Sequence, residues 1–145
     1  MRRTRRSTSP ARRSGGGASS GGRALTPPVD PWIHYGVKVG ATCNGSGSAL
    51  PGSVDGNIHL KGTATKMATL VVGLTQTDLI GGAFQYHFYT MPWLLVIPNL
   101  QLDNTLGEYD LPAPIPIEIP SGTQIYFQCF AQALNNSYSK WSDGL

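Results

Sequence analysis

The feature that most constrains the fold is a series of short apolar runs with a period of two, separated by glycine, proline and asparagine. Such runs place alternate side chains on opposite faces of an extended chain. Turn residues return about every 8–12 residues, which is typical of β-sandwiches. The 18 glycines, 11 prolines and 13% charged residues argue against a helical bundle or a coiled coil. We therefore predict an all-β fold, an antiparallel sandwich of about seven or eight short strands.

The apolar runs also predict where the elements lie. Continuous apolar runs of strand length indicate buried strands at 68–74 and 93–97. In 57–65, Ile58 and Leu60 share one face. The remaining elements that we expect are a first strand at 32–39, a long loop or short irregular edge at 40–56, strands at 84–89 and 107–111, and the approach to a last strand, cut short, at 141–145.

The clearest strand pattern covers 123–134, where both faces carry large side chains. One face holds Ile125, Phe127, Cys129 and Ala131, and the other holds Tyr126, Gln128, Phe130 and Gln132. Just before it, in 111–120, prolines 112, 114 and 116 alternate with apolar residues. Proline has no backbone donor, so this segment can pair on one side only and is expected at a sheet edge.

Charge divides the chain into two parts. All seven arginines fall in the first 23 residues, and no carboxylate precedes Asp30. The remainder has four lysines and eight acids, so the charge is +7 in the first part and −4 in the rest. A segment rich in arginine, serine and glycine buries too little apolar surface to offset its ordering entropy. We predict a disordered basic tail or linker at 1–30 and one β-sandwich domain at 31–145.

The arginines of the tail are candidate nucleic-acid-binding residues: Arg2, Arg3, Arg5, Arg6, Arg12, Arg13 and Arg23. Guanidinium groups on a flexible arm neutralise phosphates. The alternatives are a solvated leader, a linker from a longer chain or a misplaced start codon. The tail lacks the apolar core of a signal peptide, and no apolar run approaches the roughly 18 residues that span a membrane.

No motif in the sequence indicates catalysis. The chain has no nucleophile elbow, no phosphate-binding loop and no pair of acids placed for acid–base chemistry. Three histidines, His34, His59 and His87, lie in expected strands without metal-ligand spacing, so we expect them to face solvent. We predict neither an enzyme nor a bound cofactor or metal.

Two cysteines, Cys43 and Cys129, form a candidate disulfide. An even count in a small, loop-rich β domain fits one bridge. This bridge would close a loop of about 87 residues, worth roughly 4 kcal/mol on the chain-entropy model. The alternative is two reduced thiols, with Cys129 a small core residue.

The order of motifs resembles the C-terminal β-rich module of bacterial exported proteins of planctomycete and myxobacterial type, a family of unknown function. The residues that carry the resemblance are Tyr35, Gly36, Cys43, Gly45, Ser46, Gly47, Ala68, Leu70, Gly73, Leu74, Leu95, Ile97, Pro98, Gly107, Leu111, Pro112, Pro114, Ile115, Pro116, Tyr126, Gln128, Ser142, Gly144 and Leu145. The family's second cysteine usually precedes its "L-x-V-x-P" strand, where this chain has Met91-Pro92. The resemblance implies that the protein lies outside the cell or in the cell envelope. It implies no enzymatic activity, because the family has none that is established.

Three functions are compatible with the sequence. The first is a non-catalytic exported β-sandwich with a structural, adhesive or self-assembly role at the cell surface, whose partner is itself. The second is a small capsid-like or nucleic-acid-packaging protein that uses the arginine arm. The third is a glycan-binding module, which rests on aromatic residues expected at the surface: Trp32, Trp93, Trp141 and Tyr138.

Overall fold

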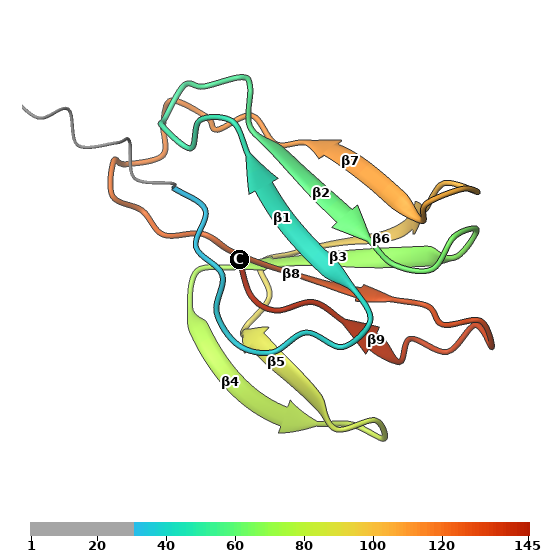
Figure 1. Cartoon of the computed structure of the whole chain (residues 1–145). Coiled ribbons are helices and arrows are strands. Elements are labelled where there is room, and N and C mark those ends of the chain that lie inside the picture. The colour runs from blue at the N-terminus through green and yellow to red at the C-terminus, as the bar shows by residue number, and fades with distance from the viewer. Residues whose placement is uncertain (1–30) are drawn as a thin grey trace, which may run out of the picture.

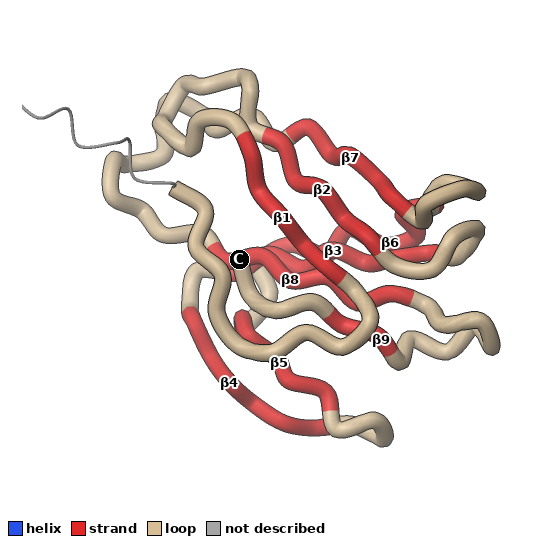
Figure 2. The backbone as a smooth tube through the Cα atoms, in the orientation of Figure 1, coloured by secondary structure: helices blue, strands red, loops and turns tan. Residues whose placement is uncertain are grey.

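Three antiparallel sheets lie one over another in the computed structural model, which describes residues 31–145 (Figure 1). These residues form strands and loops without a helix (Figure 2). The nine strands of the described part are β1 (Thr42–Ser46), β2 (Asn57–Lys61), β3 (Met67–Gly73), β4 (Gln76–Gly81), β5 (Tyr86–Thr90), β6 (Leu95–Gln101), β7 (Glu108–Pro112), β8 (Tyr126–Ala131) and β9 (Lys140–Trp141). The prediction of an all-β sandwich of short strands is confirmed. The predicted basic tail at 1–30 lies outside the described residues.

The middle layer is a four-stranded sheet with the order β6-β3-β8-β9. One of its faces is covered by the three-stranded sheet β1-β2-β7, and the other by the β4–β5 hairpin (Figure 1). The strands β3 and β8 lie between these two layers, which explains why both faces of the run at 123–134 carry large side chains. The predicted central position of 68–74 is confirmed.

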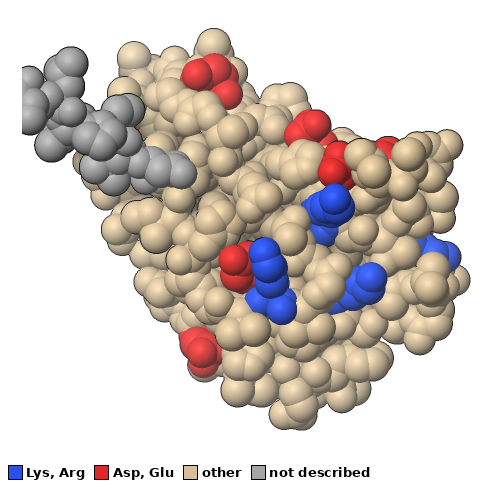
Figure 3. Space-filling view, viewed as in Figure 1, with Lys and Arg blue, Asp and Glu red and all other residues tan. Residues whose placement is uncertain are grey.

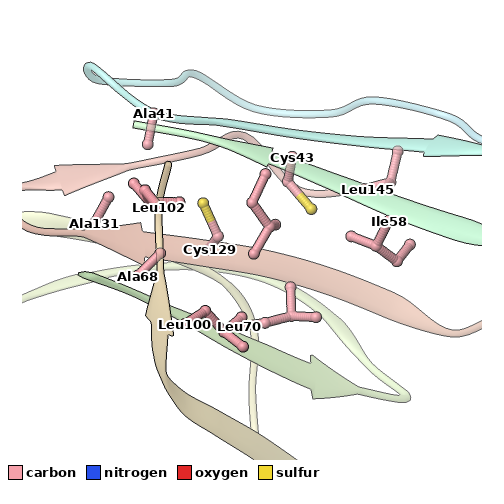
Figure 4. Packing of buried hydrophobic residues seen from close by; sticks show 11 residues of the cluster. Ala41, Cys43, Ile58, Ala68, Leu70, Leu100, Leu102, Cys129, Ala131 and Leu145 are labelled. Carbon is pink, nitrogen blue, oxygen red and sulfur yellow. The ribbon is translucent and has the colours of Figure 1, made fainter. Parts of the chain in front are cut away.

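The main core fills the space between the three-stranded and the four-stranded sheet. Ile58 and Leu60 of β2 are fully buried there, as their alternation predicts, and Cys43 and Cys129 approach from facing strands (Figure 4). The other buried members of the cluster are Ala41, Ala68, Leu70, Leu100, Leu102, Ala131 and Leu145. Burying such a set of apolar side chains, at roughly 25 cal/mol per Å², is the main stabilising term for a domain of this size.

A second core lies on the opposite face of the middle sheet, beneath the hairpin. Its buried members are Val71, Tyr89, Phe130 and Trp141. The fully buried Gln128 of β8 links the layers, because its Oε1 accepts from the Tyr89 N–H at 3.0 Å. Its Nε2 donates to the carbonyl oxygens of His87 at 2.7 Å and Ser142 at 3.2 Å. The amide is therefore satisfied within an apolar layer, where an unpaired amide would cost about 1–3 kcal/mol.

The predicted first strand at 32–39 is wrong. This segment runs along β9 and makes only isolated bridges, Tyr35 with Gly144 and Val39 with Trp141. Gly36 interrupts the extended backbone with a φ of +83°, a conformation that side chains with a Cβ rarely adopt. The segment covers the outer edge of β9 instead of forming a strand of its own.

A last strand was expected to begin at 141–145, and the chain from Trp141 to Leu145 lies alongside β8 there. After β9 the backbone continues to pair with β8, through Ser142 N–H to Cys129 C=O and reciprocal bonds between Leu145 and Phe127. Together with the bridges to 35–40, these bonds leave this side of the middle sheet covered.

The run at 93–97 was predicted to be a buried strand, and this too is wrong. The strand β6 lies at the other edge of the middle sheet, and its first residues, Leu95 and Val96, are exposed. Pro98 explains the difference, because a proline within a strand is compatible with an edge position and not with a central one. A bulge in β6 accommodates it, in which Pro98 and Asn99 together lie opposite Thr69 of β3 and Asn99 has a φ of +59°.

The proline-rich segment pairs on one side only, as predicted. Its strand β7 is short, and beyond Pro112 the chain is a loop. The N–H groups of Ala113 and Ile115 donate to the carbonyls of Gly56 and Ser53 at 2.8 and 2.9 Å. Alternating prolines thus limit the backbone donors to one row, and that row faces the 52–56 loop.

Candidate functional site

A row of exposed apolar side chains begins at the β6 edge of the middle sheet. Trp93, Leu94, Leu95 and Val96 are consecutive, and Leu94 and Leu95 are 63% and 52% exposed. Exposed apolar runs on an edge strand are uncommon in monomeric proteins, which usually protect such edges with charge. We call these four residues the β6 edge surface.

Exposed apolar side chains of the β4–β5 hairpin extend this apolar area. Leu79, Ile80 and Phe84 are about half exposed. The two areas meet at the ring of Phe88, whose centroid lies 6.0 Å from that of Trp93. The sequence from 79 to 102 contains no Lys, Arg, Asp or Glu. In Figure 3, the part of the visible face over the hairpin carries few charged atoms.

A groove of about 330 Å³ opens at one end of the molecule, where residues 31–35, the 113–125 loop and the C-terminal residues meet (Figure 1). We call it the end groove. Four aromatic residues line it, Trp32, Tyr35, Tyr126 and Phe127, together with isoleucines and prolines of the loops. Two amides, Gln76 and Gln124, contribute polar groups, and none of the lining side chains within residues 31–145 is charged.

Hydrogen bonds and ring contacts with the rest of the fold hold the rings of the end groove in place. The Trp32 indole Nε1–H donates to the Gly47 carbonyl at 3.1 Å, and its ring lies 6.2 Å from that of Phe127. Tyr35 donates from its hydroxyl to the Tyr89 carbonyl at 2.6 Å and contacts Tyr126 edge to face. Burial raises the pKa of Tyr35, with Tyr126 and Tyr89 adding to it, so its hydroxyl stays protonated and donating.

The two cysteines of the candidate disulfide lie in the same core cluster but are free thiols in the structure. Both are fully buried, and the Cys129 Sγ lies 3.6 Å from the Thr42 carbonyl oxygen. Burial raises the pKa of Cys43 well above its ordinary value, and the proximity of Cys129 and Asp143 adds to this. Burial also raises the pKa of Cys129 to about 12. Protonated, inaccessible thiols are poor nucleophiles and poor metal ligands.

Each of the three histidines contacts a carboxylate. His34 lies 3.1 Å from Asp143, His59 lies 2.7 Å from Asp110, and His87 lies 2.8 Å from Asp78. Hydrogen bonds from His59 and then Asn57 lower the pKa of Asp110. The histidines are half-buried or exposed at the surface, in three separate places. Residues 31–145 contain no group of three His, Cys, Asp or Glu side chains that could hold a metal ion.

The carboxylate of Asp103 accepts hydrogen bonds from the backbone of its own loop. Oδ1 accepts from the N–H groups of Thr105, Leu106 and Gly107, and Oδ2 accepts from that of Glu108. The bonds from Leu106 and Thr105 are the main cause of a lowered pKa at Asp103. The carboxylate therefore closes a turn, as short polar side chains commonly do.

The aromatic residues predicted to bind glycans do not share one surface. Trp141 is 7% exposed and Tyr138 packs against the second core. Trp93 belongs to the β6 edge surface, whereas Trp32 lines the end groove on the side of the main core. Only Trp32 of the four therefore lies in a groove. The arginines of the predicted nucleic-acid arm lie outside the described residues.

Sequence reasoning missed the residues that organise the site. Tyr126 and Phe127 were assigned to a strand without a ligand role, and Gln76 and Gln124 were not singled out. Nothing local distinguishes them, because loops far apart in sequence bring them together. The exposure of the β6 edge surface did have a signal, namely Pro98 directly after the run 93–97.

Comparison with protein-family models, with curated proteins and with solved structures finds no match to this chain. The resemblance to the exported bacterial module therefore stays a prediction. Within the described residues no helix has the length and hydropathy needed to cross a membrane.

Proposed function

We propose that residues 31–145 form a non-catalytic structural module that assembles with further copies of itself, in an exported or cell-envelope setting. The observation that carries the proposal is the β6 edge surface, a run of four exposed apolar residues of which Leu95 and Val96 begin the edge strand β6 and Trp93 and Leu94 directly precede it. The backbone of an edge strand has unpaired donors and acceptors, so it can accept another strand.

Two features favour a second copy of this chain as the partner. The stretch 79–102 contains no charged side chain, so two copies of this surface do not repel each other. Identical edge strands can also pair antiparallel about a two-fold axis, which is the commonest symmetry of homo-oligomers. Pro98 and the bulge limit the pairing to the first residues of β6, which specifies its register.

The test is sedimentation velocity at protein concentrations from about 10 µM to about 1 mM, a range that covers weak and moderate self-association. We expect the wild-type chain to form dimers or larger assemblies as the concentration rises. Leu95→Lys places a charge on the β6 edge surface and should reduce association by about tenfold or more, since it buries or displaces an uncompensated charge.

The matched control is Val54→Lys, which introduces the same charge at a loop residue that is 84% exposed. We expect this variant to associate like the wild type. A wild-type chain that remains monomeric at every concentration, or an equal loss of association in both variants, would contradict the proposal.

Export is a separate part of the proposal and has its own test. Fractionation of the native cells followed by intact mass, with and without reductant, locates the mature protein and its thiol state. We expect the protein outside the cytoplasm, lacking Met1. If an oxidising compartment closes the Cys43–Cys129 pair, the unreduced chain is lighter by two hydrogen atoms. An intact Met1 in the cytoplasm with free thiols would contradict export.

A further inference from the structure

We propose that the end groove is a binding site for a neutral oligosaccharide. The groove shares no residue with the β6 edge surface, so this site is independent of the proposed self-assembly. Its volume of about 330 Å³ lies at the lower end of the range for small-ligand sites, roughly 300–1,000 Å³.

The aromatic rings supply the first part of the recognition. Trp32, Tyr35 and Tyr126 line the groove while remaining only partly buried. The face of an aromatic ring is electron-rich, and the C–H groups on one side of a sugar ring are weakly electropositive, so the two stack. Because the rings are already fixed by contacts with Gly47, Tyr89 and each other, little entropy is lost on binding.

The polar groups at the rim supply the second part. Gln76 and Gln124 are exposed side-chain amides, which both donate and accept hydrogen bonds as sugar hydroxyls require. The Thr123 hydroxyl donates to the Pro120 carbonyl at 2.7 Å and offers a ligand an acceptor. The Gln124 Oε1 accepts from the Tyr126 hydroxyl at 2.9 Å, which leaves the NH₂ group to donate and a second lone pair to accept. Among the described residues no Lys, Arg, Asp or Glu side chain lines the groove, which matches a ligand without charge, because these side chains offer a charged ligand no counter-charge for its lost hydration.

An extended peptide strand fits the groove less well. The N–H and C=O of Phe127 are both bonded to Leu145, at 2.8 and 2.9 Å, and Tyr126 pairs with Gly73 of β3. Both sides of β8 are therefore occupied at this end, so β8 offers no free edge in the groove for a peptide to extend. Recognition has to use side chains, as it does for sugars.

The experiment is a titration of the ¹⁵N-labelled full chain followed by two-dimensional NMR, with cellohexaose, maltohexaose and xylohexaose as separate probes. The side-chain amides of Gln76 and Gln124 and the indole N–H of Trp32 report on the groove directly. We expect at least one sugar to shift these signals. Gln124→Ala should then weaken its binding about fivefold, the effect of losing one hydrogen bond.

Gln101→Ala is the matched control, because Gln101 is an exposed glutamine at the far end of β6. It should leave sugar affinity unchanged. The sedimentation behaviour of Gln124→Ala should equal that of the wild type, which separates this site from self-assembly. The proposal is overturned if no sugar shifts the groove signals at about 10 mM. It is equally overturned if a proline-rich peptide or a sulfated hexasaccharide shifts them more strongly than every neutral sugar.

Discussion

Burial in an apolar core controls the chemistry of both cysteines. Cys43 and Cys129 are fully inaccessible, and desolvation disfavours their thiolates. The nearby carboxylate of Asp143 acts in the same direction at both sulfurs. The folded protein therefore holds these protons more tightly than the unfolded chain does, and its stability depends on pH.

The sign follows from the raised pKa values. The stabilisation that comes from the raised thiol pKa values is complete below the ordinary thiol pKa of about 8.5. It is lost as the pH rises toward the pKa of the thiols in the folded protein, which for Cys129 is about 12. We expect the free energy of unfolding, measured in urea, to fall between pH 9 and pH 10 by up to about 1.4 kcal/mol for each thiol. The ordinary pKa of tyrosine is about 10, so tyrosines begin to titrate at the upper end of this window and a cysteine variant is needed as the control.

The control for this prediction is Cys129→Ala. This variant loses stability at pH 8 through a smaller side chain, but its further decrease from pH 9 to pH 10 should be about half that of the wild type. An unchanged decrease would show that other groups cause the alkaline loss. The sequence predicted both cysteines as a pair, and the facing strands confirm that they share a core, but the bond between them is absent.

The segment 31–40 is an element without regular secondary structure that nonetheless closes the middle sheet. Tyr89 of β5 anchors it, since its hydroxyl accepts from the Val37 N–H at 2.6 Å and donates to the Val37 carbonyl at 2.9 Å. Gly36 permits this approach, because a Cβ at that position would lie 2.3 Å from the Tyr89 ring. The Tyr89 side chain thus joins the hairpin to residues 31–40, alongside the bond from the Tyr35 hydroxyl to the Tyr89 carbonyl.

We expect Gly36→Ala to lower the free energy of unfolding by about 3 kcal/mol, because backbone strain and a steric clash add together. Gly122→Ala is the control for strain alone. Gly122 has a similar φ of +87°, but a Cβ there meets no atom within 4 Å. We therefore expect Gly122→Ala to lower the free energy of unfolding by about 1 kcal/mol. Urea unfolding of both variants measures the difference. Equal losses would mean that the clash with Tyr89 is relieved at no cost.

Edge and centre are distinguished at the level of the element. The sequence correctly places 68–74 in the centre, but it places 93–97 there as well, since both are continuous apolar runs. The strand β3 has neighbours on both sides, whereas β6 has one. The number of neighbours of a strand depends on chain topology, and a local apolar run carries no information about topology. The local residue that indicated an edge position for β6 was Pro98, because proline is confined to edge strands and bulges.

For the whole molecule, the separation of charge remains the main argument for the nucleic-acid alternative. If the arginine arm binds phosphates, the full chain should bind a duplex of about 20 base pairs with a logarithmic salt slope near −6, reflecting seven arginines. Fluorescence anisotropy at several salt concentrations measures this slope. Deletion of residues 1–23 should abolish binding, because the remainder of the chain is net negative.

A double variant, Lys61→Gln and Lys66→Gln, is the control, since it removes lysines of the β domain and keeps the arm. We expect its salt slope to equal that of the full chain. Binding that survives deletion of 1–23 and is lost in the double variant would assign nucleic-acid binding to the domain, against the proposed arm.

The sequence by itself determined the fold class, most strand positions, the faces of β2 and β8, and the one-sided pairing of the proline segment. These properties follow from alternation, turn residues and missing donors, which act over a few neighbouring positions. The tertiary structure alone decided that the hairpin covers a second face, that β6 is an exposed edge, and that the rings of the end groove meet. Each of these depends on contacts between residues far apart in the chain, and such contacts are set by how the sheets stack and leave no pattern within a single segment.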